Sequence, residues 1–150
     1  MFVKVIVRSL IILILISTAY FIYSRTATLK EKGISTHYAN LVKNKLAYVS
    51  LTKLDPKKPG FDIEKSNLVG IIQETNKIGL EKPLNSKEKE ILTRQKVILD
   101  KVFVTKSYEE GTGVLRSQES VTLLTDQTAL IEELGSQIQK IKALPLLRLP

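Results

Sequence analysis

The apolar stretch FVKVIVRSLIILILISTAYFIYSR, residues 2–25, decides how the rest of the chain is placed. No charge occurs between Arg8 and Arg25, and the mostly apolar run extends from Phe2 to Tyr23. A helix needs about 20 apolar residues to cross ~30 Å of hydrocarbon. The stretch therefore predicts a membrane-spanning helix, with these residues in the hydrocarbon: Phe2, Val5, Leu10, Ile11, Ile12, Leu13, Ile14, Leu15, Ile16, Phe21 and Ile22.

Charged and aromatic residues flank this stretch on both sides. Basic side chains near one end can snorkel to the interface. Tyrosines at the other end are typical of the aromatic belt where a helix leaves the bilayer. The residues that we expect at the interface or among lipid headgroups are Lys4, Arg8, Tyr20, Tyr23, Arg25, Lys30 and Lys32.

The stretch has two possible fates. A basic start, a short apolar run and the small residues Ser17 and Ala19 fit a signal peptide that is cleaved after Ala19. Apolarity continues past that point to Tyr23, however, and this favours a retained signal-anchor. The count of basic residues near each end leans toward a cytoplasmic body. Because a short basic leader before an apolar run is typical of export, we expect an extracytoplasmic body in the cell envelope.

The composition narrows the class of protein. The chain has 150 residues, a net charge of +8 and no cysteine, which excludes disulfides, thiolate catalysis and zinc–thiolate sites. The positive excess lies mainly in residues 24–60, directly after the apolar stretch. These basic residues are nearly all lysines and do not alternate with aromatic residues. We therefore expect lipid headgroups or solvent around them, and no nucleic-acid partner.

Two amphipathic helices are predicted next. Residues 25–33 are interpreted as a basic juxtamembrane linker or as a continuation of the membrane helix. A body helix begins near Ser35, and DPKKPGFD, residues 55–62, interrupts the helical spacing. A second helix follows, with Gly79 placed to end it. The apolar residues expected to face the core are Tyr38, Leu41, Val42, Leu46, Val49, Leu54, Ile63, Leu68, Ile71, Ile72 and Ile78.

Two further helices are expected in the second half of the chain. Asn85 or Ser86 supplies an N-cap for the third. EEGTG, residues 109–113, is expected to be a loop, and a near-heptad pattern predicts the last helix from about Ser117 to Ala143. The two apolar stripes are Ile91, Leu92, Ile98, Leu99, Val102 and Phe103, then Val121, Leu124, Thr128, Ile131, Leu134, Ile138 and Ile141.

These patterns predict an all-α fold: an N-terminal transmembrane helix followed by a small antiparallel bundle of about four helices. The expected parts are a membrane anchor (1–24), the basic linker (25–33), the helical bundle (34–144) and an apolar Pro/Leu tail (145–150). The tail is expected to fold back on the bundle, and a short docking peptide is the alternative.

The sequence predicts no catalytic, cofactor-binding or metal site. His37 is the one histidine, and without an orienting carboxylate nearby in sequence it is interpreted as an ordinary surface or boundary residue. The acidic pairs at 88/90, 109/110 and 132/133 point in different directions on a helix. The two glycines of EEGTG fall short of a phosphate-binding loop. We therefore expect no intrinsic catalysis.

The expected function is that of a single-pass, membrane-anchored interaction module, an accessory or scaffold subunit of a cell-envelope complex. Its partners would be membrane lipid and another protein or a second copy, through coiled-coil-like helices. The arrangement is similar to helical sensor ectodomains of bacterial receptors in architecture alone. One alternative is a ligand-sensing bundle with a cavity lined by Asn67, Gln127 or Thr128. Others are a secreted helical protein, and an enzyme whose acids the fold gathers near His37.

Overall fold

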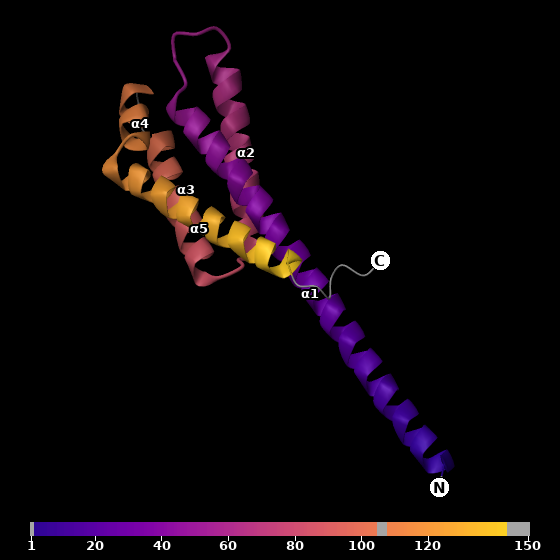
Figure 1. The fold of residues 1–150 in the computed structure, drawn as a ribbon. Helices are drawn as coiled ribbons and strands as arrows, with labels where there is room; N and C mark the ends of the chain where they lie inside the picture. Colours follow the sequence, from indigo (N-terminus) through magenta and orange to yellow (C-terminus); the bar gives the residue numbers. More distant parts are fainter. Residues whose placement is uncertain (1, 105–107, 144–150) are drawn as a thin grey trace.

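The computed structural model describes residues 2–104 and 108–143, with side chains described at 7–102, 111 and 113–143. Five α-helices occur in these residues, and no strand does: α1 (Phe2–Thr52), α2 (Phe61–Glu81), α3 (Ser86–Val104), α4 (Tyr108–Leu115) and α5 (Gln118–Lys142). Figure 1 shows a long N-terminal helix that projects from a helical bundle. The all-α fold and this arrangement are therefore confirmed. The tail, 145–150, lies outside the described residues.

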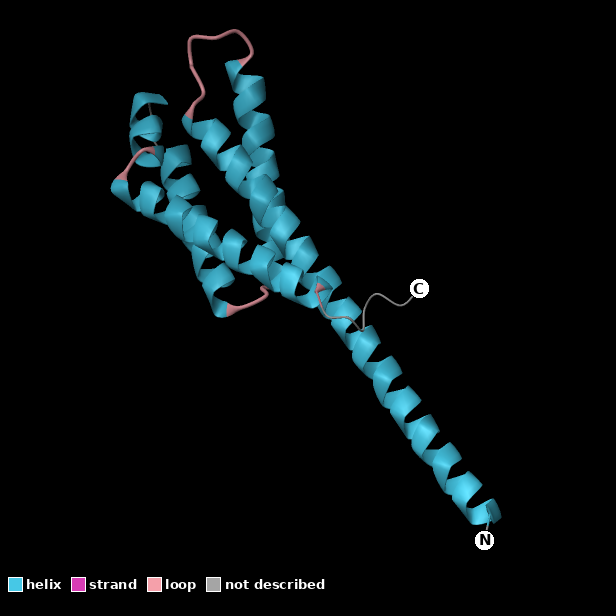
Figure 2. Cartoon of the chain, in the orientation of Figure 1, coloured by secondary structure: helices cyan, strands magenta, loops and turns pink. Residues whose placement is uncertain are grey.

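α1 is one helix, and residues 25–33 do not interrupt it. The continuation of the N-terminal apolar helix is thus the observed alternative, and the separate linker followed by a new helix near Ser35 is wrong. No proline occurs in this segment, and its hydroxyls are satisfied within the helix: Thr28 Oγ1 donates to the Ser24 carbonyl at 2.9 Å. At 1.5 Å per residue α1 is about 77 Å long. Figure 2 shows it as an unbroken helix from the tip into the bundle.

The predicted loop at DPKKPGFD is confirmed. α1 ends at Thr52 and α2 begins at Phe61. The Lys57 N–H donates to Asp55 Oδ1 at 3.0 Å, which forms a local turn. Gly60 has φ of +83°, a left-handed conformation that glycine adopts without the steric cost of a side chain. The chain reverses here, so α2 runs back along α1.

The four long helices form an up-down-up-down bundle. α1 packs against α2 and α5, and α3 contacts the same two helices. α5 runs antiparallel to α1: its first turn meets α1 at Tyr48, where the hydroxyl lies 2.6 Å from Ser120 Oγ, and its last turn meets Glu31. α1 and α3 therefore lie across the diagonal of the bundle and run parallel.

The loop predicted at EEGTG is wrong, because residues 109–113 lie inside the short helix α4. Leu115 at the end of α4 is buried, and Val114 packs against the core. Burying these side chains outweighs a helix-propensity cost of about 1 kcal/mol for each glycine. The chain turns instead at Arg116 and Ser117, and Ser117 Oγ caps α5 by accepting the Ser120 N–H at 3.3 Å.

The observed ends of α2, α3 and α5 can be compared with the predicted ones. Asn85 is the cap of α3, since its Oδ1 accepts the Glu88 N–H at 2.8 Å. The predicted bounds of the last helix agree with α5. Gly79 does not end α2, which continues to Glu81. A Cβ at Gly79 would overlap Leu92, so this glycine allows α2 and α3 to approach closely.

The core confirms part of each predicted stripe. The buried apolar residues are Ile34, Leu41, Ala47, Tyr48, Leu51, Val69, Ile72, Ile91, Leu92, Ile98, Leu99, Leu115, Leu123, Leu130 and Leu134. Four predicted core residues are exposed instead: Leu46, Ile63, Ile78 and Val121. Phe103 lies outside the described side chains. In α5 the buried face is shifted by one residue for three turns, because it includes the polar residues Ser120 and Gln127.

Ion pairs fix the alignment of α3 against α5. Three basic residues of α3 at intervals of seven pair with three acidic residues of α5 at the same interval. Exposed pairs stabilise a protein by only about 0–1 kcal/mol each, but a shifted register would break all three together. The pairs are Lys87–Glu133 at 3.3 Å, Arg94–Asp126 at 2.7 Å and Lys101–Glu119 at 3.2 Å.

Candidate functional site

The part of α1 that projects beyond the bundle, residues 7–26, is called the stalk. α1 holds the one candidate membrane span of the described residues; its apolar window has a mean hydropathy of 1.8 and no buried residue. The predicted span residues of the stalk are all exposed: Leu10, Ile11, Ile12, Leu13, Ile14, Leu15, Ile16, Phe21 and Ile22. The side chains of Phe2 and Val5 are not among those described. An exposed apolar helix of this length has the character of a membrane anchor or of a signal sequence.

Three hydroxyl groups of the stalk donate to carbonyls of the same helix, those of Thr18, Ser24 and Thr26. Thr18 Oγ1 donates to the Ile14 carbonyl at 2.8 Å, and Thr26 Oγ1 donates to the Ile22 carbonyl at 2.8 Å. In hydrocarbon no water replaces such a partner, so internal pairing removes the main cost of a hydroxyl in a spanning helix.

The residues predicted at the interface bracket the stalk. Arg8 and Arg25 are exposed and lie about 26 Å apart along the helix axis, close to the ~30 Å thickness of the hydrocarbon. Tyr23 is exposed and Tyr20 is half-buried. Lys30 and Lys32 are exposed on the first turns beyond the stalk. The side chain of Lys4 lies outside the described residues.

A buried hydrogen-bond network, here called the Asn44 hub, joins the four long helices. Asn44 Nδ2 donates to Thr75 Oγ1 and to Asn76 Oδ1, both at 2.8 Å. Asn44 Oδ1 accepts from Gln95 Nε2 at 2.7 Å and from Gln127 Nε2 at 2.9 Å. These four bonds use the full capacity of the amide. One side chain of α1 thus contacts α2, α3 and α5 at the same level of the bundle.

The Asn44 hub is incompletely satisfied at its edge. Gln95 Oε1 and Gln127 Oε1 are buried and have no hydrogen-bond partner in the described structure. Each buried acceptor left unpaired costs about 1–3 kcal/mol. Such a network adds little net stability, but a slipped register would separate Asn44 from all its partners. The hub therefore specifies how the helices align.

His37 and Glu88 form a second polar contact between α1 and α3. His37 Nδ1 donates to Glu88 Oε1 at 2.6 Å, and Glu88 Oε2 accepts the Leu84 N–H at 2.6 Å. The side chains are 15% and 2% exposed. The fold thus supplies the carboxylate partner that the sequence around His37 lacks, and His37 is a half-buried residue at the boundary of the core.

A histidine–carboxylate pair can serve as a general base only where a substrate can reach it. The adjoining space is too narrow for a water molecule and is lined by Asn40, Leu41, Asn44, Thr75, Gly79, Glu88 and Leu92. The geometry fits a structural link between α1 and α3. Among the described residues, no group of three or more His, Cys, Asp or Glu side chains could hold a metal ion.

Tyr48 and Ser120 form a third buried polar contact, between α1 and α5. Tyr48 is fully buried, and the two oxygens lie 2.6 Å apart. Burial raises the pKa of the Tyr48 hydroxyl above its ordinary value of 10.0, and the nearby Glu119 carboxylate raises it further, while the bond to Ser120 lowers it. The folded state therefore favours the neutral phenol.

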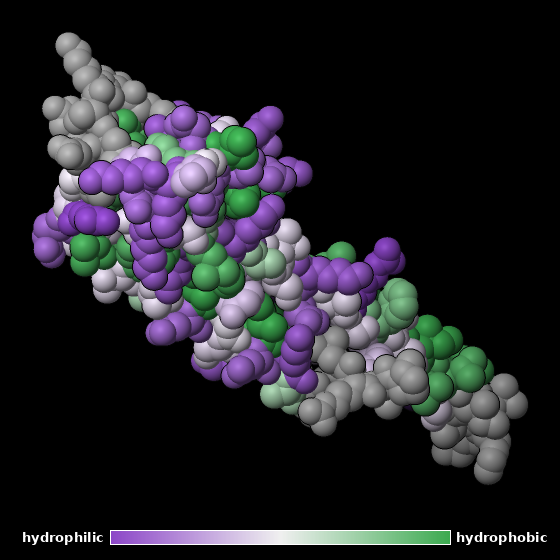
Figure 3. All heavy atoms as spheres, turned by 90° about the horizontal axis from the view of Figure 1, so that it is seen from above, coloured by the Kyte–Doolittle hydropathy of each residue, from purple (hydrophilic) through white to green (hydrophobic). Residues whose placement is uncertain are grey.

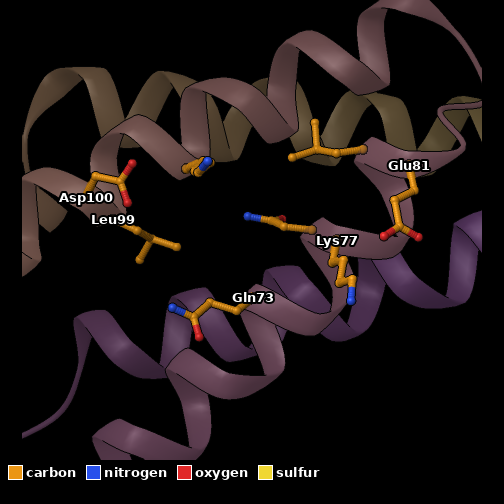
Figure 4. A pocket seen from close by; sticks show the side chains of 8 residues that line it. Gln73, Lys77, Glu81, Leu99 and Asp100 are labelled. Atoms are coloured by element: carbon orange, nitrogen blue, oxygen red, sulfur yellow. The ribbon is translucent and has the colours of Figure 1, made fainter.

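A groove of about 400 Å³ lies between α2 and α3. Its lining residues are Gln73, Asn76, Lys77, Leu80, Glu81, Lys96, Leu99 and Asp100. Figure 4 shows Gln73, Lys77 and Glu81 along α2, with Leu99 and Asp100 on the facing helix. The volume is within the range of small-molecule sites.

The polar residues proposed from sequence for a cavity do not line this groove. Gln127 belongs to the Asn44 hub, and Asn67 is exposed on α2. Thr128 Oγ1 donates to the Leu124 carbonyl of its own helix at 2.7 Å. Sequence reasoning did not predict the groove. Its lining mixes charged and apolar residues, and this mixture is typical of the solvent-exposed edges of two helices.

The polar contacts do have a sequence signal, which is spacing by seven. His37 and Asn44 are one heptad apart in α1, and their partners Glu88 and Gln95 are one heptad apart in α3. Repeated polar residues at heptad positions that face a core specify register in helical bundles. A search for apolar residues at helical spacing does not find this seven-residue repeat, because it leaves polar residues out.

Comparisons of the chain with family models, with curated proteins and with solved structures gave no match. The function must therefore be argued from the stalk, the polar interior and the groove.

Proposed function

We propose that the protein is a single-pass, membrane-anchored helical interaction module, an accessory or scaffold subunit of a cell-envelope complex without catalysis of its own. The observation that carries this proposal is the continuity of α1. Its first half exposes apolar side chains, and its second half supplies core residues such as Leu41 and Tyr48 to the bundle. The stalk and the body thus share one helix.

Continuity has a mechanical consequence for an anchored protein. A flexible linker would let the body move freely above the membrane, whereas an α-helix without proline behaves as a rod over this length. Gly33 is the single glycine of α1. The bundle would be held at a fixed height and at a fixed angle to the stalk, which suits the presentation of one face to a neighbouring subunit.

The orientation is part of the proposal. We place the body on the extracytoplasmic side, with Lys4 and Arg8 at the cytoplasmic end of the stalk. Protease is added to cells whose outer layer is permeabilised while the cytoplasmic membrane stays closed. Under these conditions it should digest the body. Protection of the body until the cytoplasmic membrane is lysed would contradict this orientation.

The partner is tested with the full chain extracted from its native membranes in mild detergent. We expect it to purify with another protein in a fixed ratio, or as a particle larger than its 16.9 kDa monomer. Asn44→Leu keeps the stalk and disrupts the body, so this variant should remain in the membrane and lose the partner. A solitary monomer for the unchanged chain would contradict the proposal.

The groove supports a second candidate function, the binding of a small amphiphile with an apolar chain and an anionic group. Leu80 and Leu99 would contact the chain, and Lys77 or Lys96 would pair with the anion at a position away from Glu81 and Asp100, which also line the groove. Since the chain has no tryptophan, Gln73→Trp places a unique fluorophore at the groove. Bromo-octanoate should quench it saturably, and Asn67→Trp, on the same helix outside the groove, should be quenched only weakly. Equal quenching at both positions would exclude a site.

A further inference from the structure

The end of the bundle from which the stalk emerges carries basic side chains from two helices. α5 runs back along α1, so its last turn lies beside the first turns of α1 beyond the stalk: Lys142 Nζ is 3.8 Å from Glu31 Oε1. Segments 25–33 and 136–143 contain one acid, Glu31, and five exposed basic residues. These five are called the basic neck: Arg25, Lys30, Lys32, Lys140 and Lys142.

The basic neck lies at the junction of two different surfaces. Figure 3 shows mainly hydrophilic side chains over the body and hydrophobic ones along the stalk, with hydrophilic side chains where the two meet. The contribution of α5 could not be found from sequence, because Lys140 and Lys142 lie more than a hundred positions after the stalk. The antiparallel packing of α5 on α1 brings them there.

Distances along α1 place the basic neck within electrostatic reach of a membrane surface at Arg25. Lys32 follows Arg25 by seven residues, or about 10 Å of helix. Lys142 lies at the level of Glu31, slightly nearer. The Debye length is about 8 Å at physiological ionic strength, so the potential of a charged surface at Arg25 falls to about a third at the level of Lys32 and Lys142. Arg25 itself lies at the surface and feels the full potential. The loop that holds Lys57 and Lys58 lies beyond Thr52, about 40 Å from Arg25, where the field is screened.

Local partners do not account for these lysines. Lys142 remains 64% exposed although it is near Glu31, and exposed pairs of this kind contribute little to stability. Lys140 and Lys142 also offset the partial negative charge at the end of α5. That role leaves the ammonium groups at the surface, where they can meet headgroups.

We propose that the basic neck docks on anionic lipid headgroups, so that the carboxyl end of α5 is a second lipid contact besides α1. This inference rests on the proposed membrane anchorage and adds to it. Docking at α1 and α5 together would fix the tilt of the body, because two helices would touch the surface instead of one. The partner is a bilayer whose extracytoplasmic leaflet holds anionic lipid, since five basic side chains beside a membrane entry point are complementary to negatively charged headgroups.

The absence of cysteine in the chain allows one to be placed at will. Gln139→Cys is exposed on the last turns of α5, and Gln118→Cys is exposed at its other end. The full chain, with a donor dye on either cysteine, is reconstituted into nanodiscs with acceptor-labelled headgroups. The discs contain phosphatidylcholine alone or mixed with phosphatidylglycerol, and energy transfer reports the distance from each label to the surface.

We expect more transfer from position 139 in the anionic discs than in the neutral ones, and no such gain from position 118. Lys140→Gln with Lys142→Gln should remove about half of the gain, since two of the five basic side chains are lost. Lys57→Gln with Lys58→Gln, the matched loss of charge at the far end, should leave it unchanged. Molar salt, which shortens the Debye length to about 3 Å, should abolish it.

Equal transfer from position 139 in both kinds of disc would overturn the proposal, as would equal effects of the two double variants. Failure of the chain to enter either kind of disc is a different result. It would contradict the membrane anchorage itself. Size-exclusion chromatography detects this result directly, because the free chain and the disc then elute separately.

Discussion

The two halves of α1 have opposite relations between polarity and exposure. In the stalk, Leu13 is 65% exposed, and the apolar residues around it are exposed to a similar degree. In the bundle half, Asn44 is fully buried and Glu31 is half-buried. Both halves belong to one helix with the same backbone geometry. The difference shows that burial here is set by the partner available at each level: none within the described protein for the stalk, and three helices for Asn44.

This comparison separates what holds the body together from what holds it in place. The body is held together by its apolar core, and polar contacts set the register of its helices. The stalk contributes nothing to that core. Substitutions in the bundle half should therefore change stability, and substitutions in the stalk should change location alone. The five predictions below follow that order.

The largest effect is expected at the Asn44 hub. Asn44→Leu leaves two glutamine side-chain N–H groups and Asn76 Oδ1 without their buried partner, and should lower the free energy of unfolding by about 4 kcal/mol. Leu46→Gln, two residues on, changes an exposed side chain and should stay within about 0.5 kcal/mol. Urea unfolding in detergent, followed by circular dichroism, measures both. A larger loss for Leu46→Gln would reverse the assignment of the buried face.

The His37–Glu88 contact should come next. His37→Leu leaves a buried carboxylate without its cationic or hydrogen-bonding partner, and should cost about 3 kcal/mol. Adding Glu88→Leu removes the unpaired carboxylate oxygen and should restore part of that loss, because the Leu84 N–H then loses its acceptor. The same unfolding measurement applies. Additive effects of the two substitutions would mean that the pair is not coupled in solution.

Two glycines of α2 give a matched test of packing. Gly79→Ala forces Leu92 aside in a filled interior and should destabilise the body by about 2 kcal/mol. Gly70→Ala meets open space on the same helix and should stabilise it by up to about 1 kcal/mol. Thermal unfolding distinguishes the two by sign. A gain in stability for both would show that α2 and α3 do not approach closely at Gly79.

Alkaline pH should weaken the body through Tyr48. Because the folded pKa is raised above the unfolded value of 10.0, the folded state holds the proton more tightly. Its contribution is therefore complete below about pH 10 and is lost as the pH rises through the folded pKa, with a slope of at most ~1.4 kcal/mol per pH unit. Tyr48→Phe should remove that slope. An unchanged slope in the variant would assign it to another group.

The smallest effect on stability is expected in the stalk. Leu13→Arg should leave the unfolding of the body within about 0.5 kcal/mol of the unchanged chain, since no described side chain buries Leu13. The same change places a charge in the middle of the proposed span, at an insertion cost of about 2.5–3.5 kcal/mol. The fraction of chain recovered in membranes should therefore fall. A large loss of body stability would mean that the stalk packs on the bundle.

The sequence was sufficient for features that rest on local chemistry. Proline and glycine located the loop after Thr52, and a cap at Asn85 or Ser86 located the start of α3. The near-heptad pattern located the start of α5 close to Ser117. The remaining helix boundaries depend on long-range packing. Gly79 and the glycines of α4 were predicted to lie at helix ends or in a loop, but they lie inside helices, because packing against neighbouring helices stabilises a helical backbone there.

The candidate site was predictable to a similar extent. The exposed apolar residues of the stalk follow from composition alone. The core face of α5 was displaced by one residue because Ser120 and Gln127 were taken for surface positions. Their burial depends on Tyr48 and Asn44, which lie 72 and 83 residues away in sequence. A search for polar residues that repeat every seven positions would have recovered part of that pattern.

The central claim is that the stalk stays on the protein and holds the body at a membrane. It is tested most directly by washing native membranes with alkaline carbonate and determining the mass of the chain in the pellet and in the supernatant. The account predicts an intact chain in the pellet, with residues 2–25 present. A chain that begins at Tyr20 and appears in the supernatant would contradict it.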